Sequence, residues 1–393
     1  MNQLFSQINV PVPNQKSFSS VRKYSEKICE SLITEDYVIQ PCPEVSPPKW
    51  HLAHTTWFWE EFILSKYISD YRRFHPKFSF LFNSYYEGVG ERAPRPHRGN
   101  MSRPSVAEIL EYRHYVDESM FKVLNAFDED DLIHLIQIGI NHEQQHQELL
   151  FTDIKYILGH NPLFPPYHEK FKETPELNYD NTFAQTEGGT FEIGFEGDGF
   201  SFDNEHGRHN VTLEDFSIRK SLVTNGEYLD FINDNGYLRP DLWLSDGWTW
   251  KNETKVQAPL YWNMDEGIVK RYSLAGLDEV DMNEPVTHIS FYEASAFAEW
   301  KKMRLPTEFE WEAAADQFKW GQRWEHTNSA YLPYPRYKKP DGPIGEYNGK
   351  FMINQMVLRG ASVVTPEGHS RKTYRNFFDP SLRWQFNGIR LCI

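Results

Sequence analysis

The chain has 393 residues, a length typical of two or three domains. Its 56 acidic residues outnumber the 41 basic ones, and the resulting net charge of −15 argues against a nucleic-acid partner. No apolar stretch approaches the roughly 20 residues that a membrane span needs, and the start lacks the pattern of a signal peptide. Three scattered cysteines, Cys29, Cys42 and Cys392, do not indicate a disulfide framework. These features predict a soluble protein of the cytoplasm.

Residues 1–165 are expected to be mostly helical. Segments 17–34, 49–68, 105–127 and 129–159 have the length of helices, and four such helices predict a four-helix bundle. The apolar stripes that support three of them are Val21, Tyr24 and Ile28 in the first, Leu52, Trp59 and Ile63 in the second, and Ile109, Tyr112, Val116, Met120 and Val123 in the third.

A polar, proline-containing linker is expected over 166–181, and the residue composition changes after it. Residues 182–393 combine glycine, tryptophan and short β-branched or aromatic runs, which predicts one α+β domain. Ser290 is expected to cap one helix there. Thr307 and Glu310 have the spacing of a capping box at the start of another.

The sequence HEQQH places His142 and His146 four residues apart. On a helix such a pair shares one face, close enough for both ring nitrogens to bind one metal ion. Leu135, Gly139 and Leu149 belong to the same stripe, so both imidazoles are expected to point into the bundle. The alternative is a pair of core histidines that bind no metal.

A third metal ligand is available on the second predicted helix, where His51 and His54 stand three residues apart. Three histidines on one side of a metal leave coordination positions for substrates and oxygen. Without a thiolate, this ligand set suits iron, copper and zinc alike. HEQQH also satisfies the zinc-protease pattern, although the extended pattern of one protease class fails at Leu149 and Thr152.

Nearly the whole chain resembles one known family. KWHLAHTTWFWEEFIL and NHEQQHQELL resemble the DinB-like bundle of the ergothioneine-type sulfoxide synthases. GGTFEIG, RLPTEFEWEAAA and the final WQFNGIRL resemble the formylglycine-generating-enzyme-like (C-type-lectin-like) domain that is fused to that bundle. The expected fold is therefore a DinB-like four-helix bundle over 1–165 and a formylglycine-generating-enzyme-like domain over 182–393.

The resemblance implies an iron(II) site formed by His54, His142 and His146. It also implies a reaction in which a cysteine-type thiol is joined to the imidazole carbon of hercynine, the trimethylated histidine, with O2 as oxidant and a sulfoxide as product. The thiol substrate would be cysteine or γ-glutamylcysteine.

The loop around Tyr85 and Tyr86 is similar to the branch of the family whose active-site tyrosines lie in the bundle domain. The resemblance implies that these tyrosines supply a proton or electron that steers the reaction to C–S coupling. Arg95 and Arg98 are then expected to bind the carboxylate of the thiol substrate, since a guanidinium group binds a carboxylate through two hydrogen bonds.

Phe377 and Phe378 lie in a segment that resembles the betaine pocket of this branch. Aromatic faces suit a quaternary ammonium group, which has no hydrogen-bond donors. Gln145 is expected to bond to the same substrate. Three alternatives stay open: ovothiol-type coupling of free histidine and cysteine, selenoneine synthesis, and a non-catalytic ligand-binding module.

Overall fold

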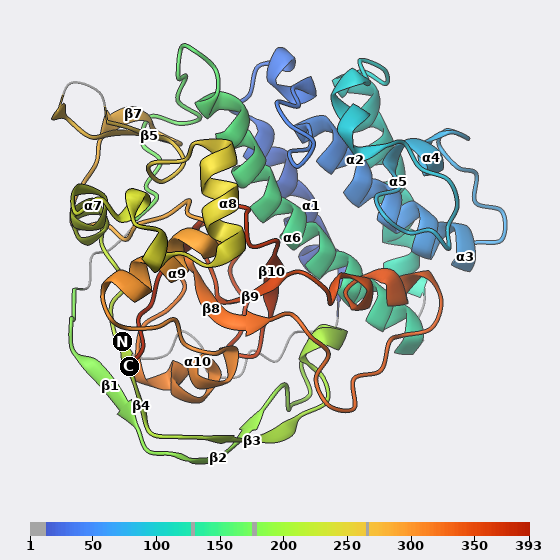
Figure 1. Ribbon diagram of the computed structural model, residues 1–393. Helices are drawn as coiled ribbons and strands as arrows, with labels where there is room; N and C mark the ends of the chain where they lie inside the picture. Colours follow the sequence, from blue (N-terminus) through green and yellow to red (C-terminus); the bar gives the residue numbers. More distant parts are fainter. Residues whose placement is uncertain (1–12, 127–129, 175–178, 265–266) are drawn as a thin grey trace. The chain divides into compact units, whose positions relative to one another are not determined.

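The computed structural model describes residues 13–126, 130–174, 179–264 and 267–393 (Figure 1). Phe127, Glu129 and positions 175–178 of the expected linker lie outside this part of the chain. The described residues form two compact units. The helical unit comprises the chain up to His168 together with 341–347 and 365–369, and the mixed unit comprises 169–340, 348–364 and 370–393.

The helical unit is built on four long helices that pack against one another, as the sequence predicts (Figure 1). The second of them continues through a π-helical turn, Glu60–Leu64, a feature that is frequent near functional sites. The helices are α1 (Gln15–Cys29), α2 (Pro48–Trp59), α3 (Ser65–Tyr67), α4 (Phe78–Phe82), α5 (Val106–Ala126) and α6 (Asp130–Gly159).

The apolar stripe predicted for α5 is confirmed, because Ile109, Tyr112, Val116, Met120 and Val123 are all buried. The residues predicted for α2 and its continuation, Leu52, Trp59 and Ile63, are buried too.

The stripe predicted for α1 is wrong at Tyr24, whose side chain is 39% exposed. The buried face of this helix carries Phe18, Arg22, Ser25 and Ile28 instead. Arg22 and Ser25 are buried because both bond to the carboxylate of Glu143 on α6. Hydrophobic periodicity does not reveal a polar pair of this kind.

The mixed unit contains a four-stranded sheet with the order β10-β9-β8-β11. Strand β9 is antiparallel to both of its neighbours, and β11 is parallel to β8. Strands β1 and β4 form one antiparallel pair, β2 and β3 another, and β5, β6 and β7 form a three-stranded sheet. The strands are β1 (Phe183–Thr186), β2 (Gly189–Ile193), β3 (His209–Leu213), β4 (Phe216–Arg219), β5 (Trp262–Asn263), β6 (Lys270–Ser273), β7 (Gly276–Glu279), β8 (Trp324–Ala330), β9 (Met356–Gly360), β10 (Asn376–Phe378) and β11 (Asn387–Gly388).

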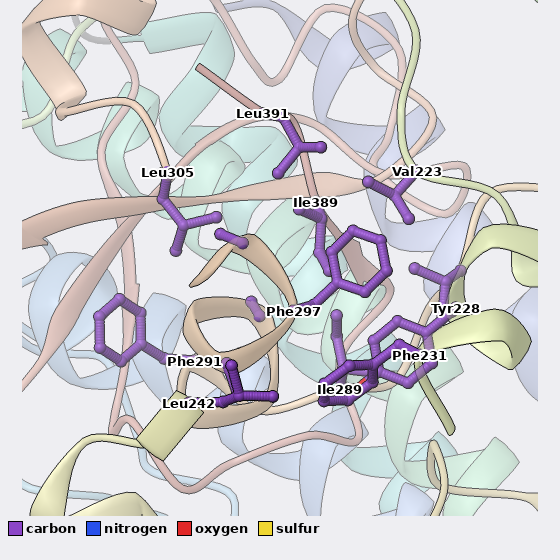
Figure 2. Close-up of a cluster of buried hydrophobic side chains, with 14 of the residues drawn as sticks. Val223, Tyr228, Phe231, Leu242, Ile289, Phe291, Phe297, Leu305, Ile389 and Leu391 are labelled. Atoms are coloured by element: carbon purple, nitrogen blue, oxygen red, sulfur yellow. The ribbon is translucent and has the colours of Figure 1, made fainter. Parts of the chain in front are cut away.

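Helices α7 (Asn225–Asn233), α8 (Ser245–Thr254), α9 (Phe291–Trp300) and α10 (Glu308–Ala314) complete the mixed unit. Figure 2 shows part of its core, in which side chains of α7 and α9 meet the C-terminal segment that carries Ile389 and Leu391. Both predicted caps are confirmed, since Ser290 caps α9 and Thr307 caps α10 through complete capping boxes.

Among the helices of the described chain, none has both the length and the apolar character that crossing a membrane requires.

Candidate metal centre

Helices α2 and α6 bring His54, His142 and His146 together. One ring nitrogen from each histidine lies within 4.8 Å of the other two, in a cluster that can hold a metal ion. The two histidines of α6 are one turn apart and therefore share a face, while His54 approaches from the facing helix.

The ring orientation of His54 is set by a backbone carbonyl. His54 Nδ1–H donates to the carbonyl oxygen of Phe82 over 2.6 Å, which leaves Nε2 with a lone pair. This Nε2 lies 3.1 Å from Nε2 of His142. Two nitrogens that each bind one metal ion at about 2.1 Å, at right angles, are about 3 Å apart, so the pair has the spacing of adjacent ligands.

Burial keeps the three imidazoles neutral. It lowers the pKa of His142 to about 3 and holds the pKa values of His54 and His146 well below the ordinary range, with the other histidines of the cluster adding to the effect for both. The buried Nδ1 of His142 has no hydrogen-bond partner among the described residues. Neutral imidazoles that converge in this way fit a divalent transition metal, and the donor set does not distinguish iron, copper and zinc.

His51, the other candidate on α2, lies beside this cluster. Its Nδ1 is 2.8 Å from Nδ1 of His146, and its Nε2 is 2.9 Å from Oδ2 of Asp153. His51 therefore lies behind His146, one of the three clustered histidines, and outside the cluster itself. Asp153 stands two turns beyond His146 on α6, and this spacing is the signal that could have identified it from the sequence.

Glu143, which would be the general base of a zinc protease, is engaged elsewhere. It is fully buried and accepts hydrogen bonds from Arg22, Arg113, Ser25 and Trp59. Burial alone would raise its pKa, but the two guanidinium groups outweigh burial and hold the pKa well below its usual range. A carboxylate held in this way does not activate a water, which argues against the protease hypothesis.

Arg98 lies close to the cluster and is only 4% exposed. Its guanidinium carbon is 3.3 Å from the centre of the Trp50 ring, and that ring stacks on His54 with centroids 4.6 Å apart. Arg98 donates to the hydroxyl of Ser46 over 2.9 Å, while no carboxylate in the described part of the chain bonds to it. Burial and the nearby charge of Arg95 lower the pKa of Arg98 to about 8, and the carboxylate of Asp153, which is not hydrogen-bonded to Arg98, offsets this only in part.

Arg95 differs from Arg98 in its surroundings. Its side chain is exposed and donates to the backbone carbonyl of Glu44. Of the two predicted carboxylate clamps, only Arg98 is buried beside the histidines.

Tyr85 and Tyr86 stack on each other with ring centroids 4.6 Å apart. Tyr86 is fully buried, and its pKa is raised well above the ordinary value by burial and by its neighbour Tyr85. The side chain of Asn83 holds the loop through hydrogen bonds with the backbone N–H and C=O of Tyr86.

A segment from far along the chain, 341–347, belongs to the helical unit. Glu346 accepts the backbone N–H groups of Glu87 (3.0 Å) and Gly88 (2.8 Å), directly after the two tyrosines. The hydroxyl of Tyr347 donates to the side-chain oxygen of Gln145, and the Tyr347 ring lies edge-on to His142 at 5.9 Å. Sequence reasoning missed both residues, because no local pattern links positions about 200 residues apart.

Phe377 and Phe378 belong to strand β10 of the mixed unit. Consecutive residues of a strand point to opposite faces. Accordingly, Phe377 stacks on Tyr331 at 4.1 Å, whereas Phe378 contacts Trp384 at 6.3 Å.

Comparison with known proteins matches each half of the chain to a family. Residues 17–150 match the DinB superfamily, and residues 168–339 match the sulfatase-modifying factor enzyme 1-like domain. The chain is therefore a two-domain protein that joins a DinB-type bundle to a domain of this α+β class, as predicted.

Three relatives match the chain over most of their own length and of this one. The chain is 28% identical to hercynine oxygenase from Mycolicibacterium smegmatis, over 89% of this chain and 91% of the relative. It is 26% identical to the enzyme of that name from Mycolicibacterium thermoresistibile (89% and 87%) and 27% identical to that from Mycobacterium tuberculosis (89% and 91%). These hercynine oxygenases are homologues of the chain over about nine tenths of its length.

Proposed function

We propose that the protein is a non-haem iron(II)-dependent sulfoxide synthase of ergothioneine biosynthesis, acting on small molecules in the cytoplasm. Its homologues include the hercynine oxygenases, which makes it an enzyme of the oxygenase type. The thiol R–SH, the imidazole C–H of hercynine and O2 give the sulfoxide R–S(O)–imidazole and one water. A C–S and an S–O bond form, the S–H and C–H bonds break, and O2 takes up four electrons.

The observation that carries the proposal is the cluster of His54, His142 and His146 beside a buried arginine to which no described carboxylate is hydrogen-bonded. Iron(II) held by these histidines would activate O2 and bind the donor atoms of both substrates on its open side. The protein contributes neutral imidazoles whose orientation is set by neighbouring groups, such as the Phe82 carbonyl for His54.

Arg98 is proposed to bind the carboxylate of the thiol substrate. A buried guanidinium group that is hydrogen-bonded to no carboxylate is costly, and an incoming carboxylate would relieve this cost through charge-assisted hydrogen bonds. The stack of Arg98, Trp50 and His54 would place that carboxylate at a fixed position relative to the histidines. Arg95, being exposed, is proposed to contribute less.

Tyr85 and Tyr86 are proposed to donate the proton that directs the reaction to C–S coupling. The raised pKa of Tyr86 keeps its phenol protonated at neutral pH, as a donor requires. Glu346 and Asn83 hold the loop that carries both tyrosines.

Hercynine is proposed to use Gln145 for hydrogen bonding, and Tyr347 holds the oxygen of that amide. The trimethylammonium group is proposed to pack against the aromatic side chains of β10. Phe377 and Phe378 lie on opposite faces of the strand, so substituting each by Leu in turn separates their roles. Only the variant that lacks the ring in contact with the ammonium group should show a raised KM for hercynine.

Oxygen uptake by the iron(II)-loaded protein tests the proposal, with hercynine plus cysteine in one reaction and hercynine plus γ-glutamylcysteine in the other. Mass spectrometry should show the coupled sulfoxide with one of these thiols, and His142→Ala should abolish both uptake and product. Tyr86→Phe should divert the product toward cysteine sulfinate, whereas Tyr71→Phe, a matched change at a tyrosine that bonds Glu60, should not.

The alternatives give other results. Product only with free histidine would indicate ovothiol-type coupling, and product only with a selenium donor would indicate selenoneine synthesis. Ligand binding without oxygen uptake, unchanged in His142→Ala, would indicate a non-catalytic binding module.

A further inference from the structure

A buried chain of hydrogen bonds connects Asp153 to one of the three clustered histidines. Asp153 Oδ2 is 2.9 Å from His51 Nε2, and His51 Nδ1 is 2.8 Å from His146 Nδ1. His51 is 2% exposed and Asp153 3%, so water does not replace these contacts. Asp153 Oδ2 also accepts the backbone N–H of Ser46 at 2.8 Å, which holds the carboxylate in place.

The positions of the protons follow from this chain. A carboxylate only accepts, so Nε2 of His51 carries a hydrogen and donates it to Asp153. When the His51 ring carries this one hydrogen, it donates through Nε2 and accepts through Nδ1. The Nδ1 of His51 is then an acceptor, and the Nδ1 that faces it in His146 must carry the hydrogen. A neutral His146 with its hydrogen on Nδ1 has its lone pair on Nε2.

We propose that Asp153 and His51 are positioning residues that select the tautomer of His146 and orient its Nε2 toward the metal. This inference rests on the three-histidine metal site of the proposed function. It adds a carboxylate and a second histidine behind one ligand, in the role that a single carboxylate or carbonyl has at many metal sites. The carbonyl of Phe82 has the corresponding role for His54.

Cobalt(II) titration under anaerobic conditions tests the inference without any turnover. His51→Phe should weaken cobalt(II) binding about 10- to 100-fold, the usual effect of removing a partner of a ligand. It should also change the cobalt(II) absorption spectrum, since His146 is no longer oriented. His114→Phe is the matched control, because His114 is an exposed histidine of the same unit.

A double variant separates positioning from folding. His51→Phe leaves the carboxylate of Asp153 buried without its histidine partner and should destabilise the metal-free protein. His51→Phe combined with Asp153→Asn should recover part of that stability in urea unfolding, while cobalt(II) affinity stays as low as in His51→Phe alone. If the double variant recovers cobalt(II) affinity together with stability, the inference is overturned, because the loss of affinity in His51→Phe would then come from the loss of stability alone.

The outcomes distinguish this inference from the proposed function. If the wild type binds cobalt(II) and His142→Ala does not, the metal site stands. If His51→Phe then keeps the wild-type affinity and spectrum, the positioning role is wrong while the site survives. If the wild type itself binds no cobalt(II), both the site and the inference fall.

Discussion

At the scale of single residues, Arg98 shows a conflict between stability and binding. It is buried beside the histidines, and among the described residues no carboxylate is hydrogen-bonded to it, although Asp153 is near enough to offset part of its charge. If stability were the only requirement, an apolar side chain of similar volume would be favoured at this position. The proposed binding of a substrate carboxylate would explain why a cation is kept at this position.

Arg98→Met is expected to leave the ligand-free protein as stable as the wild type or more stable, because it removes a buried cation that forms no ion pair with a described carboxylate. It should nevertheless weaken thiol binding by about 10- to 150-fold, which corresponds to the loss of charge-assisted hydrogen bonds worth about 1.5–3 kcal/mol. Urea unfolding and the KM for the thiol measure the two effects. The exposed Arg72→Met is the control, and a large loss of stability in Arg98→Met without a change in KM would contradict the proposal.

At the scale of elements, α2 and α6 approach closely at a glycine. A methyl group added at Gly139 would lie 2.5 Å from the ring of Trp59, which is fully buried. Gly139 is on the same face of α6 as His142, so the close approach also sets the distance between the helices that carry the three histidines.

Gly139→Ala should therefore destabilise the helical unit by about 1–3 kcal/mol, the usual cost of overpacking. Helix propensity alone predicts the opposite sign, since Ala is favoured over Gly by about 1 kcal/mol inside a helix. Urea unfolding followed by circular dichroism decides between the two effects. Gly189→Ala, where nothing lies within 4 Å of the added methyl group, should be nearly neutral.

The start of α10 predicts a pH dependence. Burial alone would raise the pKa of Glu310, but hydrogen bonds from Arg304 and Thr307 outweigh it and lower the pKa below its ordinary value of 4.5. Because the pKa is lower in the folded state, the stabilisation is fully present above the unfolded value and is lost as the pH falls through the folded value.

The stability difference between the wild type and Glu310→Gln should thus shrink as the pH is lowered from about 6 to about 3. Thr307→Ala removes the hydroxyl that caps the same helix, at a cost of about 1 kcal/mol. Only part of that loss should persist over the whole range: the bond from the Glu310 N–H to the hydroxyl does not titrate, whereas the bond from the hydroxyl to the Glu310 carboxylate weakens when the carboxylate is protonated. Urea unfolding at several pH values compares the two variants, and parallel curves would contradict the role of the ionised carboxylate.

At the scale of the whole molecule, the chain returns twice to the helical unit. Segments 341–347 and 365–369 belong to this unit although they follow most of the mixed unit in sequence. They bond to side chains on one stretch of α6: Tyr347 to Gln145, Thr365 to Glu148, and His369 to Gln144. Helix α6, which carries His142 and His146, is therefore held by residues from both halves of the sequence.

Metal binding should stabilise the folded protein. A metal that binds only the folded state adds about 2.7 kcal/mol when its free concentration is 100 times its Kd. Anaerobic iron(II) should accordingly raise the Tm of the wild type, and a chelator should reverse the rise. His142→Ala should show neither effect, and an equal rise in that variant would indicate metal binding elsewhere.

Much of this architecture follows from local sequence alone. The long helices, the apolar stripes of α2 and α5, the capping boxes at Ser290 and Thr307, and the pair His142 and His146 are all determined within a few turns of chain. Such features depend on periodicity and on hydrogen bonds between near neighbours, and both are visible in the order of residues.

Tertiary structure decided which groups meet. It separated His54, in the cluster, from His51, behind it. It also placed Asp153 of α6 against His51 of α2 and brought Tyr347 to α6. It also exposed Tyr24 and buried Arg22, against the apolar pattern of α1, because the Glu143 carboxylate required a buried cation. Contacts of this kind depend on the path of the chain between distant segments, and no local periodicity encodes that path.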